Sequence, residues 1–127
     1  MKKIIATTDA PKAIGPYSQA VQVNGQIYVS GQLPVDPSTG KIVEGDISAQ
    51  TEQVMKNIGA ILEAAGCTFA DVVKSTVLLH DIKDFKAMNE VYGRYYPENS
   101  PARAAYQVAN LPLDAKIEIE TIAVNNH

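Results

Sequence analysis

The apolar positions of the chain predict two amphipathic helices. In the first, apolar residues recur mostly three, four or seven positions apart, which gives one stripe on a helix of about five turns. Asp46 is the expected N-cap of this helix and Gly66 its C-terminal stop. The second helix is capped by Asp81 or Asp84 and ended by Pro97. Its apolar stripe consists of Phe85, Met88, Tyr92 and Tyr95.

The other regular segments are predicted strands. Residues 21–23 and 27–29 flank Asn24-Gly25, and this dipeptide strongly favours the tight turn of a β-hairpin. Residues 36–40 have the composition of a second turn. Three more strands are expected at 72–79, 104–108 and 116–124, and a short additional strand is allowed at 3–6.

The order β-β-α-β-α-β-β predicts an α+β fold, in which a mixed β-sheet carries both helices on one face. The length suits one domain, which we expect to cover residues 1–127. No element is then left to cover the other face of the sheet. An uncovered face of this kind marks an interaction surface, and we therefore expect a homo-oligomer that packs sheet against sheet.

Charge and composition narrow the class of protein. The formal net charge is −3 and the chain has no cluster of Lys and Arg, which disfavours nucleic acid or an anionic membrane as partner. No apolar run has the length of a secretion signal or a membrane span. The single cysteine, Cys67, excludes an intrachain disulfide and suits a reducing compartment. We expect a cytoplasmic protein.

The last predicted strand carries the first candidates for chemistry. Ile117 and Ile119 share one face, whereas Glu118 and Glu120 share the other, about 6.6 Å apart. Either both glutamates are simply solvated, or one lines a cleft and handles protons, because burial raises a carboxyl pKa. Beyond Thr121 the alternation breaks, and we expect that end of the strand to be buried on both faces.

Arg103 is the second candidate, because it stands among small residues at the start of a strand. Its two parallel N–H donors match a carboxylate, and the alternative is a structural salt bridge with a glutamate. Gly31 would let a backbone group face a ligand. His80, His127 and the lone cysteine lack the spacing of metal ligands, so we expect no metal site.

Six stretches of the chain carry a further signal in their order and spacing. They are Ala10-Pro11 through Ile14-Gly15-Pro16-Tyr17-Ser18-Gln19-Ala20, Ser30-Gly31-Gln32-Leu33-Pro34, 53–66, 84–92, Pro101-Ala102-Arg103 and 111–120. Together they resemble the reactive intermediate deaminase (RidA, YjgF) family over nearly the whole chain. No single motif is decisive, but the set is highly specific.

The resemblance implies a chorismate-mutase-like, YjgF-type α+β fold. It implies a homotrimer whose sheets pack into a central barrel, with three ligand clefts between neighbouring subunits. The implied activity is hydrolytic deamination of 2-iminobutanoate and 2-iminopropanoate to 2-keto acids and ammonia, without a cofactor. Dehydratases that use pyridoxal phosphate release these imines, as enamines, from threonine and serine.

The resemblance also implies roles for individual residues. Arg103 matches the arginine that grips the substrate carboxylate, and Glu118 matches the carboxylate that positions water at the imine carbon. The implied substrate-binding positions are Tyr17, Ser30, Gly31, Asn89, Arg103 and Ala105. Ala105 replaces a cysteine that many members carry, and hydrolysis does not need that thiol.

Three other functions stay open on the sequence. The first is a non-catalytic trimer that binds 2-keto acids and regulates a partner. The second is the nucleic-acid or translation-related activity attributed to some relatives, against which the net charge speaks. The third is an oxidation-activated holdase chaperone, which a chain with one cysteine and no thiol at Ala105 fits poorly.

Overall fold

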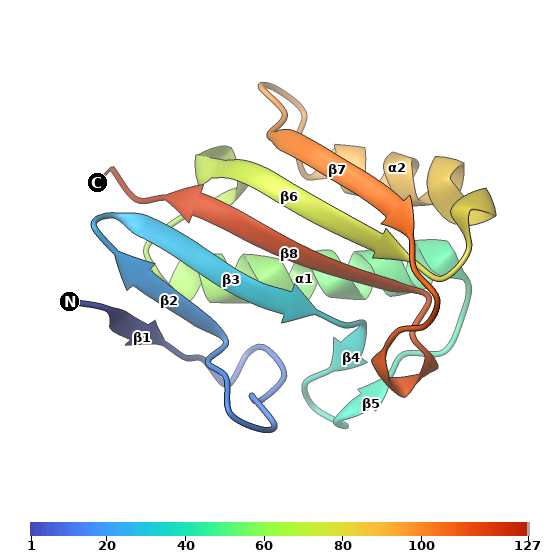
Figure 1. Ribbon diagram of the computed structural model, residues 1–127, viewed down its shortest axis with the longest axis horizontal. Helices are drawn as coiled ribbons and strands as arrows, with labels where there is room; N and C mark the ends of the chain where they lie inside the picture. The colour runs from blue at the N-terminus through green and yellow to red at the C-terminus, as the bar shows by residue number, and fades with distance from the viewer. Residues whose placement is uncertain (127) are drawn as a thin grey trace.

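The structure is a computed structural model that describes residues 1–126 and leaves His127 outside. A six-stranded sheet lies across two helices (Figure 1). Its order is β1-β2-β3-β8-β6-β7, and all neighbours are antiparallel except β6 and β7. The strands are β1 (Lys3–Ile5), β2 (Ala20–Val23), β3 (Gln26–Gln32), β6 (Val72–Leu79), β7 (Ala102–Gln107) and β8 (Ile117–Val124). The predicted α+β class with a mixed sheet is confirmed.

The first predicted helix is α1 (Ile47–Ala64). The Asp46 carboxylate accepts a hydrogen bond from the Ala49 N–H at 3.0 Å, which confirms the cap. Gly66 follows the helix with φ +77°, a left-handed conformation that glycine adopts without strain. Both ends of α1 are therefore determined locally.

The second helix, α2 (Phe85–Arg94), begins differently from the prediction. Asp81 caps the short 3-10 helix η2 (Ile82–Asp84), where its carboxylate accepts from the Lys83 N–H at 2.9 Å. Asp84 occupies the N-cap position of α2 but makes no capping hydrogen bond with its side chain. One aspartate thus caps the turn that leads into the helix, and the other marks its start.

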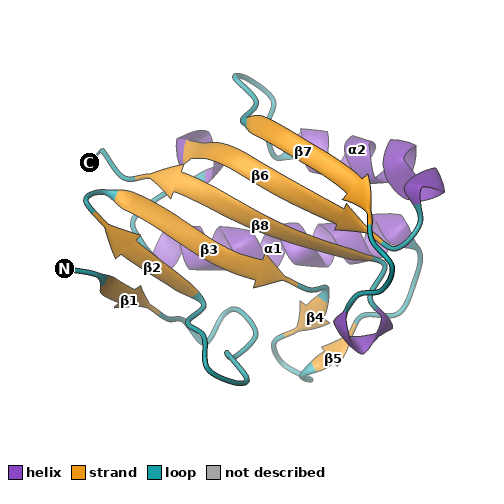
Figure 2. Cartoon of the chain, in the orientation of Figure 1, coloured by secondary structure: helices purple, strands orange, loops and turns teal. Residues whose placement is uncertain are grey.

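The turns follow from residue chemistry. Asn24 and Gly25 have φ values of 51° and 78°, and a type I′ hairpin turn needs positive φ at both positions. The predicted turn at 36–40 joins two strands that the pattern missed, β4 (Val35–Asp36) and β5 (Lys41–Ile42) (Figure 2). Two residues per strand are too few to show an alternation.

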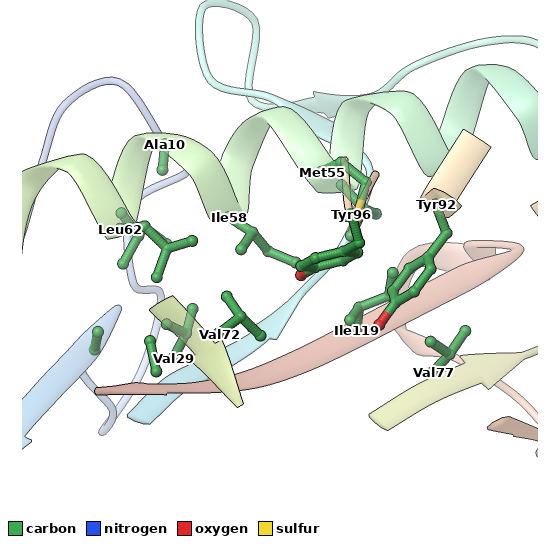
Figure 3. Close-up of a cluster of buried hydrophobic side chains, with 14 of the residues drawn as sticks. Ala10, Val29, Met55, Ile58, Leu62, Val72, Val77, Tyr92, Tyr96 and Ile119 are labelled. Atoms are coloured by element: carbon green, nitrogen blue, oxygen red, sulfur yellow. The ribbon is translucent and has the colours of Figure 1, made fainter. Parts of the chain in front are cut away.

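The core lies between the helices and one face of the sheet. Met55, Ile58 and Leu62 of α1 point toward the sheet, where Val29 and Ile119 lie (Figure 3). All five side chains are buried. Burial of each contributes about 1.5–3 kcal/mol relative to exposure, which fixes the sheet against the helices.

The opposite face of the sheet has no helix over it (Figure 2). Tyr28 and Tyr106 are exposed, and Ile122 and Val124 are only half-buried. The prediction that the end of the last strand is buried on both faces is therefore wrong for the single chain, in which burial alternates along the whole of β8. An exposed sheet face that carries such apolar side chains is a surface that a second copy of the chain would cover in an oligomer.

Candidate functional site

A β-bulge brings the backbone of β3 against a carboxylate of β8. Val29 pairs with Thr121 and Gln32 with Ile119, so β3 has one extra residue between these pairs. Ser30 and Gly31 consequently both fall on the open face. A Cβ atom at Gly31 would overlap Oε2 of Glu118 and lie 2.9 Å from its Cδ. Only glycine leaves room for that carboxyl group.

Glu118 and Glu120 differ in their surroundings although they share a face. Glu118 is half-buried and Glu120 is exposed. Burial raises the pKa of Glu118, and the negative charge of Glu120 raises it further. A carboxylate whose pKa moves toward neutrality is the better proton acceptor for a water molecule. The alternative that both glutamates are simply solvated is wrong for Glu118.

A cavity of about 980 Å³ lies beside Glu118. Tyr17, Ser30, Gly31, Glu118 and Glu120 all line it. Four residues of the predicted site are thus brought together, from the first loop, β3 and β8. The exposed Tyr17 is held in place because its hydroxyl accepts from the Ile14 N–H at 3.2 Å.

Ser30 has a structural role in this wall. Its hydroxyl donates to the Ser18 carbonyl at 2.6 Å, and its N–H donates to the Gln19 carbonyl at 2.9 Å. The buried Gln19 side chain accepts from the Thr7 N–H and donates to the Pro11 carbonyl, at 2.7 and 2.8 Å. These contacts fix the loop that carries Tyr17. Gln19 lies in a stretch that the resemblance covers, but no sequence signal gave it this role.

The other predicted site residues gather around Arg103. Its Nη1 donates to Oδ1 of Asn89 at 2.6 Å, and its Cζ lies 5.3 Å from the ring centroid of Phe85 and 5.0 Å from that of Tyr92. Among the residues that the structure describes, no carboxylate forms a salt bridge with Arg103. The structural salt bridge is therefore not formed within the described chain. Ala105 follows two residues later on β7 and is half-buried.

One chain keeps these two groups apart. Arg103 lies beside α2, on the face of the sheet that the helices cover, whereas Glu118 lies on the open face. The strand β6 separates β7 from β8 (Figure 1). Neighbouring strands are about 4.8 Å apart, so β7 and β8 are separated by about 10 Å. Within one chain, Arg103 and Glu118 therefore do not face a common small ligand.

Leu113 is a lining residue that the sequence analysis missed. It lies in the 3-10 helix η3 (Pro112–Asp114), borders the same cavity as Glu118, and is 66% exposed. Its φ of 58° is rare for a leucine and costs about 1–2 kcal/mol. Its place in Leu111-Pro112-Leu113, within a stretch that the resemblance covers, was the available signal.

The surroundings of the His, Cys, Asp and Glu side chains can be described within residues 1–126. No three His, Cys, Asp or Glu side chains gather there in a way that could hold a metal ion. Cys67 is buried, and burial raises the pKa of its thiol. The helices of this part of the chain are too short or too polar to cross a membrane.

Fold and site together define a class of protein: a small α+β protein that presents a half-buried carboxylate in a cavity and an unpaired arginine at a sheet edge. The family model described as endoribonuclease L-PSP matches residues 7–125. The chain belongs to this family, which is the RidA/YjgF family that the sequence resembles.

Similar proteins agree with this assignment. The human 2-iminobutanoate/2-iminopropanoate deaminase is 55% identical over 98% of this chain and 90% of its own. A RutC family protein of Pyrococcus horikoshii is 56% identical, over 97% and 98%. RidA from an Antarctic Psychrobacter superposes with a TM-score of 0.93 at 51% identity, over 96% and 98%. Escherichia coli TdcF with bound serine has the same TM-score at 44% identity, over 98% and 99%.

Proposed function

We propose that the protein hydrolyses reactive 2-imino acids, such as 2-iminobutanoate and 2-iminopropanoate, to 2-keto acids and ammonia. The observation that carries the proposal is the half-buried Glu118 carboxylate, which lies across Gly31 in a cavity next to Tyr17. It occurs in a chain that is 55% identical to a deaminase of these imines. The proposal needs no cofactor, because the carbon of a protonated imine is already electrophilic.

The proposed mechanism uses two charged residues. Arg103 binds the substrate carboxylate through parallel N–H donors and so fixes the imine carbon. Glu118 accepts a proton from water while the water oxygen attacks that carbon. The proton then passes to the nitrogen of the tetrahedral intermediate. The C–N bond breaks as the hydroxyl group of the intermediate gives its proton to Glu118 and becomes the keto oxygen. One imine and one water become one 2-keto acid and one ammonia.

The proposed assembly is a homotrimer with its clefts between subunits. Arg103, Asn89 and Ala105 would come from one copy, and Tyr17, Ser30, Gly31 and Glu118 from its neighbour. The open face of the sheet supports this, since its half-buried Ile122 and Val124 would pack in a central barrel. We also propose that residues 1–127 form one domain and that the protein acts in the cytoplasm.

The geometry favours a small substrate over RNA. Glu118 and Glu120 both line the cavity, and their negative charges oppose a phosphodiester backbone. The net charge of −3 acts in the same direction. The serine bound to Escherichia coli TdcF is a small molecule with a carboxylate next to its amino-bearing carbon, as in a 2-imino acid.

The direct test measures the lifetime of the imine. Threonine dehydratase and threonine generate 2-iminobutanoate, and semicarbazide traps what survives. The wild type should lower the trapped fraction, whereas Arg103→Ala should not, because the carboxylate is no longer held; a loss of at least about 10²-fold in kcat/KM is expected. Circular dichroism and light scattering control for folding and assembly. If the wild type leaves the trapped fraction unchanged, the deaminase proposal fails and a non-catalytic protein that binds 2-keto acids becomes the leading hypothesis.

A further inference from the structure

The guanidinium group of Arg103 lies against aromatic rings instead of an acidic partner. Phe85 and Tyr92 both stand on α2, and both ring centroids lie within the range of about 6 Å over which a cation is attracted to a ring face. Asn89, on the same helix, accepts one N–H. These three contacts come from neutral side chains, so they hold the arginine without neutralising its charge.

The ring of Tyr92 is itself fixed by its neighbours. It is 5% exposed and packs against Tyr96, with ring centroids 4.8 Å apart and an interplanar angle of 45°. Tyr96 in turn meets Phe69 edge to face at 5.6 Å. Burial raises the pKa of the Tyr92 hydroxyl, so the ring stays a neutral phenol at physiological pH. The support under Arg103 is therefore rigid and uncharged.

We propose that Phe85 and Tyr92 are positioning residues for substrate binding, which hold the Arg103 guanidinium in one orientation through their ring faces. The inference rests on the proposed role of Arg103 toward a carboxylate. Arginine has five N–H donors, of which Asn89 takes one. A guanidinium that is already ordered loses less side-chain entropy when a carboxylate binds. The rings thus contribute to affinity without touching the ligand.

The test measures the affinity of the assembled protein for 2-oxobutanoate, a 2-keto acid product, by NMR titration. Phe85→Leu removes one ring face and should weaken binding about three- to tenfold. Phe85→Tyr and Tyr92→Phe keep the faces and should stay within about twofold of the wild type. Val91→Ala is the matched control, because Val91 is buried on the same helix α2 but is not among the Arg103 contacts.

A double-mutant cycle separates positioning from a general loss of structure. If Phe85 acts through Arg103, Phe85→Leu should not weaken binding further when Arg103→Ala is already present. In turnover, Phe85→Leu should raise KM with little change in kcat. The proposal is overturned if Phe85→Leu binds like the wild type, if Val91→Ala has an equal effect, or if the loss persists without Arg103. A wild type that binds 2-oxobutanoate but hydrolyses no imine would refute the proposed function and leave this inference intact.

Discussion

At the scale of single residues, the site depends on a glycine that faces a carboxylate. The sequence indicates that another group can come close to the backbone at Gly31. It does not indicate which group that is. The structure gives the reason: the bulge turns Gly31 to the open face, and the Glu118 carboxyl occupies the space of the missing side chain. The pKa of Glu118, and hence its choice over Glu120, depends on that burial.

Gly31→Ala should displace the Glu118 carboxyl group. Because the overlapping atoms are the end of a flexible side chain, we expect a change in unfolding free energy below about 1 kcal/mol. Misplacement of the base by about 1 Å should lower kcat/KM about 10²-fold. Gly93→Ala is the control, since a Cβ there meets nothing within 4 Å and should stabilise α2 by about 0.5–1 kcal/mol with normal activity. Normal activity of Gly31→Ala would contradict the placement of the base.

The pH dependence should report the raised pKa of Glu118. The active carboxylate form is lost as pH falls through that pKa, so the acidic limb of kcat/KM should lie above the usual glutamate value of about 4.3. Glu120→Gln removes a neighbouring negative charge and should move this limb to lower pH. Glu118→Gln should lower kcat by about 10²–10⁴-fold. An unchanged limb in Glu120→Gln would show that the two carboxyls are not coupled.

The same shift has a consequence for stability. The folded state binds the Glu118 proton more tightly than the unfolded state does. The contribution of Glu118 to the free energy of unfolding is therefore fully present below its pKa in the unfolded state, and is lost as pH rises through its pKa in the folded state. Glu118→Gln should therefore be more stable than the wild type at neutral pH, and the difference should fall in acid, where the Glu118 carboxyl of the wild type is protonated.

At the scale of elements, sequence pattern predicted most of the fold. The stripe and caps of α1 and the Asn24-Gly25 turn rest on local spacing and local backbone preference, and each was found as expected. Strand β7 begins two residues before its predicted start at 104, because its pairing with β6, and not its composition, sets its limits. The pair β4 and β5 was missed because strands of two residues show no alternation.

Asn57 couples α1 to the wall of the cavity. It is 1% exposed and donates through Nδ2 to the carbonyls of Leu33 and Val35, at 3.1 and 2.9 Å. Asn57→Ala should lower the free energy of unfolding by about 1–3 kcal/mol, because buried carbonyls lose their donor. Asp46→Ala is the control, because the loss of this helix cap should lower the free energy of unfolding by a similar amount, about 1 kcal/mol, away from the cavity. Urea unfolding and KM should show that only Asn57→Ala also weakens substrate binding.

At the scale of the whole molecule, the candidate site is divided between two regions that one chain keeps apart. Arg103 and Glu118 stand on opposite faces of the sheet with β6 between their strands. The open face with Tyr28, Tyr106 and Ile122 offers the surface through which a second copy could bring them together. The homotrimer remains a prediction.

Mixing two inactive variants tests the shared site. Arg103→Ala and Glu118→Gln should each be inactive alone, but subunits exchanged at equal ratio should regain about a quarter of wild-type sites, because some clefts combine an intact arginine with an intact glutamate. A chain with both substitutions, mixed with Arg103→Ala, should regain nothing. A stable monomer in light scattering, or no recovery after confirmed exchange, would place the whole site within one chain.

The sequence alone determined the helices, the hairpin and the α+β class, because spacing, capping and turn chemistry act over a few neighbouring positions. It also supplied the candidate site residues, most of them through the family resemblance. It left open whether Glu118 is solvated and whether Arg103 is paired. Only the tertiary structure decided these points, since burial of Glu118 depends on the bulge in β3 and the surroundings of Arg103 depend on α2. Burial and pairing are properties of segments distant in sequence, which meet only when the sheet has formed.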